Sequence, residues 1–117
     1  MSSAAAKPVD MDHLARYTGG DATLNAEVLD LFATQSVELL SDLRAVMDAR
    51  DAKGWKEITH SLKGAARGIG AFDFGDAVAH AEGAIPTDDN ANAIAALHAM
   101  QQEAELVWRF IAAYLGR

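Results

Sequence analysis

Residues 60–70 read His60-Ser61-Leu62-Lys63-Gly64-Ala65-Ala66-Arg67-Gly68-Ile69-Gly70, and the rest of the chain is organised around them. At about 100° per residue, a helix from Trp55 to about Gly70 has two distinct faces. The apolar face carries Trp55, Ile58, Leu62, Ala65, Ala66 and Ile69. The polar face carries Lys56, His60, Lys63, Gly64 and Arg67. A histidine centred on a polar face does not fill a core, and the glycine beside it costs the helix about 1 kcal/mol relative to alanine. Close approach by another molecule would explain why glycine is there.

The length and composition favour a single all-helical domain. The chain has 117 residues, half of them hydrophobic and only two of them proline, and β-branched and aromatic runs are rare. It has no cysteine, which excludes disulfide bonds, a thiol nucleophile and thiolate metal sites. We expect residues 1–8 to be a flexible N-terminal lead-in and residues 9–117 to form one helical bundle domain.

The charge of the chain narrows the classes of partner. The formal net charge is −7, whereas non-specific binding to nucleic acid or to anionic membranes needs a cationic surface. No apolar run approaches the ~20 residues of a membrane span, and residues 1–7 lack the long apolar core of a signal peptide. The sequence therefore predicts a cytoplasmic protein with no nucleic-acid or membrane partner.

One short and four long amphipathic helices account for most of the sequence. Asp10 and Asp21 are suited to cap the first two helices, and Asp51-Ala52-Lys53-Gly54 is expected to be a connection before the third. The predicted helices span residues 11–17, 22–50, 55–70 and 73–84, with a last helix that follows Asn90 and runs to about residue 115. Long helices with short connections predict an all-α fold, an antiparallel four-helix bundle with a short additional N-terminal helix.

The second and the last helix are also assigned a buried stripe each, from residues that recur at steps of three and four. In the second helix this stripe is Leu24, Val28, Leu31, Phe32, Gln35, Leu39, Leu43 and Val46. In the last helix it is Ile94, Leu97, Ala104, Trp108, Ile111 and Leu115.

The motif His60-x-Leu62-Lys63-Gly64, followed by small residues and Gly70, resembles the signature of the histidine-containing phosphotransfer (HPt) domain. The resemblance covers roughly residues 9–85. In that family the histidine accepts a phosphoryl group from the aspartate of one receiver domain and passes it to another. The resemblance implies that His60 is the phosphoryl carrier, that Lys63 lies near the phosphoryl oxygens, and that Gly64 leaves room for the loops of the receiver.

The chemistry asks little of the carrier. Phosphoryl transfer needs a neutral imidazole nitrogen, in-line approach and stabilisation of charge on the phosphoryl oxygens, and an exposed imidazole is neutral for much of the time at physiological pH. Helical spacing adds Arg67 and Lys56 to the His60 face as partner-docking residues; the alternative is that both are ordinary solvated cations. His13, His80 and His98 lack such a face and are read as surface or boundary residues.

The resemblance also implies the partners and the cofactor. We expect a freestanding phosphorelay intermediate that takes phosphate from the receiver domain of a hybrid histidine kinase and gives it to a response regulator. Mg²⁺ would be supplied by the receiver and no cofactor bound by this chain, since Asp88-Asp89-Asn90 fits helix capping better than a metal site. The docking surface would be the His60 face together with an adjoining, partly apolar strip of the second helix. A monomer is expected, because four helices can close their own core.

Two alternatives belong to other classes. A non-transferring helical adaptor would bind a receiver without exchanging phosphate, and the presence of His60 counts against it. A metal-dependent bundle enzyme would need paired, inward-facing Glu-x-x-His motifs, whereas Glu57-Ile58-Thr59-His60 occurs once and its histidine is expected to face out. The protein is therefore expected to be a phosphoryl carrier and not a stand-alone kinase.

Overall fold

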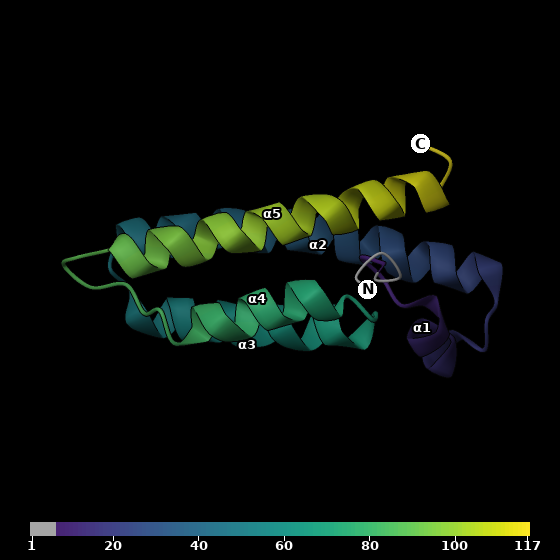
Figure 1. Cartoon of the computed structure of the whole chain (residues 1–117), viewed down its shortest axis with the longest axis horizontal. Helices are drawn as coiled ribbons and strands as arrows, with labels where there is room; N and C mark the ends of the chain where they lie inside the picture. The colour runs from purple at the N-terminus through teal and green to yellow at the C-terminus, as the bar shows by residue number, and fades with distance from the viewer. Residues whose placement is uncertain (1–6) are drawn as a thin grey trace, which may run out of the picture.

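The structure is a computed structural model that describes residues 7–117, and it confirms an all-α bundle (Figure 1). Residues 7–117 contain no strand. Helix α2 packs against α3, α3 against α4, α4 against α5 and α5 against α2, so the four helices close a ring, while α1 packs on α2. The five helices are α1 (Met11–Thr18), α2 (Ala22–Asp48), α3 (Ala52–Gly68), α4 (Phe72–Glu82) and α5 (Ala91–Tyr114). Among them, none is long and apolar enough to cross a membrane.

Aspartate caps fix the starts of three helices. The Asp10 carboxylate accepts hydrogen bonds from the backbone N–H groups of Asp12 and His13, and the Asp21 carboxylate accepts one from Leu24, as the sequence predicts. Asp51 does the same for Gly54, so α3 begins at Ala52 and the connection expected over residues 51–54 is wrong. A side-chain cap satisfies an N–H that has no partner in the first turn.

The predicted buried stripe of α2 is correct at Phe32 and Leu43, but as a whole it lies one residue, or about a quarter of a turn, from the observed buried face. Leu24 and Leu31 are exposed, and the buried side chains are Asn25, Leu29, Phe32, Ser36, Leu40, Leu43 and Met47. Two of these buried residues, Asn25 and Ser36, are polar, so they interrupt the apolar pattern by which a buried face is recognised in a sequence. Asn25 accepts a hydrogen bond from Thr18 at 2.5 Å, and Ser36 accepts one from the Trp108 indole at 2.8 Å. Hydrogen bonding of this kind offsets the cost of burying them.

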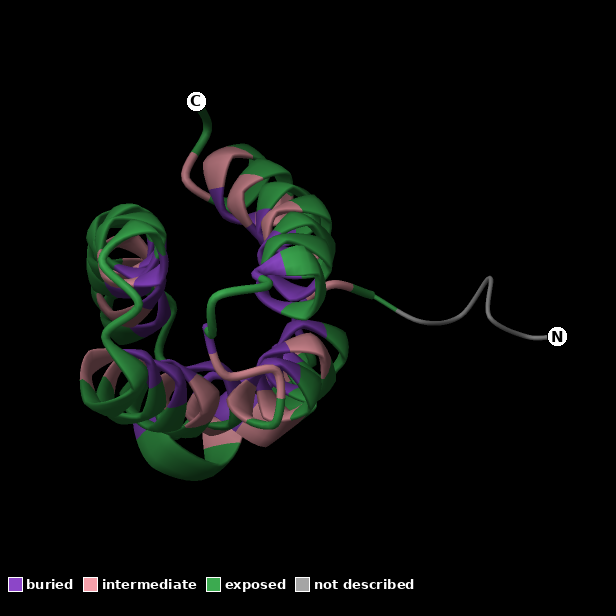
Figure 2. Ribbon diagram, turned by 90° about the vertical axis from the view of Figure 1, so that its left-hand side faces the viewer, coloured by how far each residue is buried: buried purple, intermediate pink, exposed green. Residues whose placement is uncertain are grey.

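The stripe of α5 is partly right. Leu97, Ala104 and Ile111 are buried as predicted, whereas Ile94 is 55% exposed and Ala93 and Ala96 take the interior positions of that turn. Met100 and Val107 complete the buried side of the helix. In Figure 2 the buried residues line the interior of the bundle and the exposed ones its outside.

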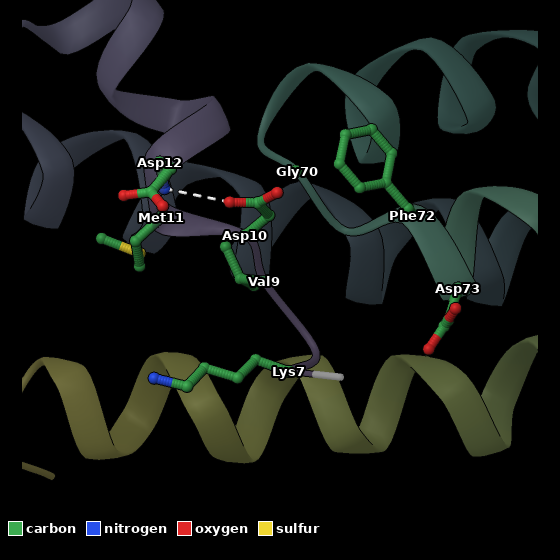
Figure 3. Close-up of a pocket in the computed structure, with 8 residues that line it drawn as sticks. All are labelled: Lys7, Val9, Asp10, Met11, Asp12, Gly70, Phe72 and Asp73. Atoms are coloured by element: carbon green, nitrogen blue, oxygen red, sulfur yellow. Dashed lines mark hydrogen bonds between the residues drawn. The ribbon is translucent and has the colours of Figure 1, made fainter. Parts of the chain in front are cut away.

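The segment before α1 crosses the turn between α3 and α4 (Figure 3). The backbone N–H of Asp10 donates to the carbonyl of Gly70 at 2.9 Å, and Val9 is fully buried. Gly70 has φ = +87°, and a Cβ at this position would lie 2.5 Å from the Asp10 carbonyl oxygen. Glycine is therefore required both by the backbone conformation and by the close approach. The chain turns at Gly70, and α4 begins at Phe72, one residue before the start predicted at residue 73.

Residues 1–6 of the predicted lead-in lie outside the described residues. Pro8 is half-buried and Lys7 is exposed.

Candidate functional site

The inner face of α3 anchors the helix to its neighbours. Trp55, Leu62 and Ala66 have no exposed surface, which agrees with the apolar face predicted from the sequence. The Trp55 indole N–H donates to the carbonyl of Ala81, in the last turn of α4, at 2.8 Å. Thr59, also fully buried, bonds to the carbonyl of Trp55 at 2.8 Å. The bond from Trp55 to Ala81 holds the start of α3 against the C-terminal end of α4, whereas the Thr59 bond lies within α3.

The outer face of α3 presents an open imidazole. The His60 side chain is 78% exposed. Gly64 lies one helical turn further on, and a Cβ placed there would have no atom within 4 Å. No internal packing requires glycine at this position, since the space beside it is solvent. The surface next to His60 is therefore bare backbone, which another molecule can approach closely.

A carboxylate from α4 joins the site. Glu82, the last residue of α4, places Oε1 at 2.5 Å from the Lys63 ammonium and Oε2 at 3.7 Å from Nδ1 of His60. The first is a direct charge-assisted hydrogen bond, and the second is an electrostatic contact beyond hydrogen-bond length. The hydrogen bond from Lys63, with the positive charge it carries and the nearby His60, holds the pKa of Glu82 below its usual range.

The site is sheltered on the side of the ion pair and open on the side of the imidazole. The Lys63 and Glu82 side chains are 23% and 28% exposed, because both lie between α3 and α4. A carboxylate beside Nδ1 favours the ring tautomer with its proton on that nitrogen. The arrangement can therefore offer the Nε2 lone pair to a partner while a cation stands one turn away.

The two other predicted cations behave differently from each other. The Arg67 side chain lies against α4. Its Cγ is so close to Gly75 that a Cβ added there would be 3.0 Å away, and its guanidinium lies 3.8 Å from the Asp76 carboxylate. Lys56 is exposed and, among the contacts of residues 7–117, takes part in no ion pair. Of the predicted set, the structure brings His60, Lys63 and Gly64 together and draws Arg67 towards α4.

An apolar groove runs beside the C-terminal half of α3. Its exposed apolar side chains include Tyr17, Leu24 and Leu31, which are 69%, 39% and 58% exposed. Ala65 and Gly68 of α3 form one wall. The groove is lined by Leu14, Tyr17, Thr18, Leu24, Val28, Leu31, Phe32, Gln35, Ala65, Gly68 and Ile69. Several residues assigned to the core stripe of α2 thus form a surface strip next to the His60 helix.

The other three histidines lie away from this constellation. The His13 ring packs edge-on against Phe72, with centroids 4.9 Å apart, and also against Tyr17. His80 and His98 are exposed. Over the described range, 7–117, no group of three or more acidic or histidine side chains is arranged to hold a metal ion. Asp89 and Asn90 instead bond to the backbone where α5 begins.

Glu82 is the site residue that the sequence interpretation missed. It follows His60 by 22 positions, and no local motif marks it. The available signal was its place near the end of the helix that follows α3 in an antiparallel bundle, which brings it level with the middle of α3. Which side chain of α4 faces His60 (Glu82, Asp76 or His80) depends on how α4 is rotated about its own axis. The sequence pattern does not determine that rotation.

Comparison with known proteins agrees with the fold. The crystal structure of histidine-containing phosphotransfer protein B (HptB) from Pseudomonas aeruginosa PAO1 superposes with a TM-score of 0.82 at 25% sequence identity, over 93% of this chain and 95% of that one. A search of curated protein sequences finds no match. The model of the Hpt domain family matches residues 27–109, well over half of the sequence. The chain therefore belongs to the Hpt domain family.

Proposed function

We propose that this chain is a phosphorelay intermediate that carries a phosphoryl group on His60. It takes the group from a receiver-domain aspartate of a hybrid histidine kinase and passes it to a response regulator. Membership of the Hpt family supports histidine phosphotransfer in a phosphorelay. The observation that supports His60 as the carrier is its exposed position at the centre of α3, with Lys63 and the bare Gly64 backbone beside it.

In the transfer step, Nε2 of His60 attacks the phosphorus of the receiver's aspartyl phosphate. The N–P bond forms as the P–O bond to aspartate breaks, and the aspartate carboxylate leaves with the electron pair. The ring proton stays on Nδ1, which faces Glu82. The next receiver aspartate reverses the step. Positioning and charge stabilisation supply most of the catalysis in such a reaction.

The receiver would dock on the His60 face and the adjoining apolar groove. Tyr17, Leu24 and Leu31 offer apolar contact area, and large side chains at the centre of an interface contribute most of its affinity. Lys56 and Arg67 would attract the acidic pocket of the receiver and set the rate of encounter. We propose that Mg²⁺ belongs to that pocket and not to this chain.

The same proposal includes the remaining properties of the protein. It acts as a carrier rather than a stand-alone kinase, as a cytoplasmic monomer whose four long helices close their own core.

A transfer assay tests the proposal. The protein is mixed with a phosphorylated receiver domain and Mg²⁺, beside the variants His60→Gln and His98→Gln. The second variant removes an exposed histidine of α5 and serves as the matched control. We expect acid-labile, base-stable label on the wild type and on His98→Gln, and none on His60→Gln. Tight receiver binding by all three proteins without label on any would assign the chain to the class of non-transferring adaptors.

A further inference from the structure

We propose that Glu82 is a positioning residue that holds Lys63 in the resting protein and gives it up to the phosphoryl group on His60. The proposal rests on the proposed function and adds to it the control of how strongly His60 retains phosphate. In the resting site the Lys63 ammonium is already paired with the Glu82 carboxylate, so a phosphoryl group on His60 would compete with that carboxylate for it.

The Lys63–Glu82 pair differs from the other ion pairs of residues 7–117. Its atoms are 2.5 Å apart and both side chains are more than two-thirds buried. The pairs Lys53–Glu57 and Arg67–Asp76 are 3.9 Å and 3.8 Å long, and each has at least one side chain two-thirds exposed or more. Arg117–Asp30 is a direct contact of 3.0 Å, but its side chains are 64% and 46% exposed. Exposed pairs contribute little because water and salt screen them. Glu82 is therefore the carboxylate that competes effectively for a cation at this site.

The position of Glu82 is built into the fold. The hydrogen bond from the buried Trp55 indole to Ala81 fixes the residue directly before Glu82 against α3. The α3–α4 contact thus places one carboxylate between the cation and the imidazole, with one oxygen towards each. Nδ1 is the ring nitrogen in contact with Glu82, so Nε2 is the nitrogen left for a phosphoryl group.

Phosphorylation changes the charge balance of this cluster. A phosphoryl group on Nε2 brings up to two negative charges to the ring whose other nitrogen faces Glu82. The phosphoryl oxygens attract the Lys63 ammonium, and the Glu82 carboxylate opposes them in two ways: it competes for the ammonium and it repels the phosphoryl group. Both effects disfavour phospho-His60. The carboxylate thereby keeps the phosphoryl group easy to pass on.

The measurement is the equilibrium between phospho-receiver and phospho-His60. Removing the charge in Glu82→Gln should shift it towards phospho-His60 by about fivefold, the effect of one elementary charge a few ångströms away near a protein surface. Asp76→Asn is the matched control, because it makes the same charge change on the same helix, where the carboxylate pairs with Arg67. It should leave the equilibrium within about twofold of the wild type. Glu82→Asp retains the charge and should restore most of the wild-type value.

A double-mutant cycle tests the route through Lys63. In a Lys63→Gln background, Glu82→Gln should have at most about half its effect, since only direct repulsion remains. Phosphoramidate serves as a donor that needs no receiver: its P–N bond breaks, ammonia leaves after taking a proton from water, and the N–P bond to His60 forms. On this reaction, the ¹⁵N signal of the Lys63 ammonium should move in the wild type.

The outcomes separate the two proposals. If Glu82→Gln matches Asp76→Asn, or if its full effect persists without Lys63, the role of Glu82 is refuted while that of His60 stands. An unmoved Lys63 signal upon phosphorylation of His60 would have the same meaning. If the wild type takes no label on His60 from either donor, the proposed function fails and the role of Glu82 fails with it.

Discussion

The two faces of α3 carry opposite physical requirements. On the inner face, Trp55, Leu62 and Ala66 are fully buried and touch the rest of the bundle. On the outer face, His60 is mostly exposed and Gly64 has empty space beside it. The inner face is constrained by volume, because a close-packed interior registers the loss of even one methylene. The outer face is constrained only by what must reach it from outside.

This difference separates stability from chemistry within a single helix. Changes on the inner face should act on the unfolding free energy, and changes on the outer face should act on transfer or docking. Glu82 and Trp55 are where the two faces meet, since the buried indole fixes the turn that carries the carboxylate.

The largest effect is expected for Trp55→Ala. Removing a fully buried tryptophan leaves a cavity and should lower the unfolding free energy by about 3–5 kcal/mol, measured by urea denaturation. A loss below about 1 kcal/mol would show that the inner face is not close-packed at this point.

Trp55→Phe sharpens the comparison because it keeps most of the volume and removes the indole donor to Ala81. We expect a loss of about 1–2 kcal/mol and a weaker Lys63–Glu82 contact, seen as a rise in the Glu82 pKa. An unchanged Glu82 pKa would mean that Trp55 acts on stability alone.

Leu31→Asp should act on docking and not on folding. Leu31 is 58% exposed in the apolar groove, so its replacement should weaken receiver binding by about tenfold and change stability by no more than about 0.5 kcal/mol. Titration calorimetry with a receiver domain measures the first. Val37→Asp, on the same helix and 52% exposed but outside the groove, should bind normally. Equal losses in both variants would point to net charge and not to the groove.

Gly64→Ala should separate the two requirements at one position. Alanine is the better helix former and meets no neighbour, so the unfolding free energy should rise by up to about 1 kcal/mol. Transfer from a receiver should slow several-fold, because a methyl group now stands where the partner approaches. Labelling by phosphoramidate, which is small, should be unaffected. Slowing with both donors would mean that the methyl group disturbs His60 itself.

The smallest effect concerns pH. Because the pKa of Glu82 is lowered in the folded protein, its pair with Lys63 stabilises the fold fully above the ordinary glutamate value of 4.5. This contribution is lost as the pH falls through the lowered folded value. A ¹³C titration of the carboxyl should show the lowered midpoint in the wild type and a return towards 4.5 in Lys63→Gln. Equal midpoints in the two proteins would remove Lys63 as the cause.

Much of this arrangement follows from the sequence because the signals are local. The polar and apolar faces of α3 and the caps at Asp10 and Asp21 depend on residues a few positions apart, and all are found as predicted. The buried face of α2 was misjudged because Asn25 and Ser36 are polar, and their partners, Thr18 and Trp108, come from other helices. Ile94 was placed inside although the small Ala93 and Ala96 fill that end of the core.

The site likewise has a local part, which the sequence predicts, and a part that depends on the packing of another helix. His60, Lys63 and Gly64 lie within one helical turn, so the sequence places them on one face. Glu82 comes from a different helix, and the rotation of that helix is set by packing around Trp55, Phe74 and Val78. The exposed strip of α2 next to His60 was expected from the family resemblance, but its residues were assigned to the core instead.

The crossing at Gly70 has a practical consequence for measurements on this protein. Because Asp10 is held at that turn, Lys7 emerges beside Asp73 and Glu103, at the start of α4 and against α5. Glu82 lies at the other end of α4, nine residues on and roughly 13 Å away along the helix. A fluorophore or a surface tether attached at Lys7 would therefore leave His60 accessible. Attachment at Lys7 therefore suits single-molecule measurements of receiver binding.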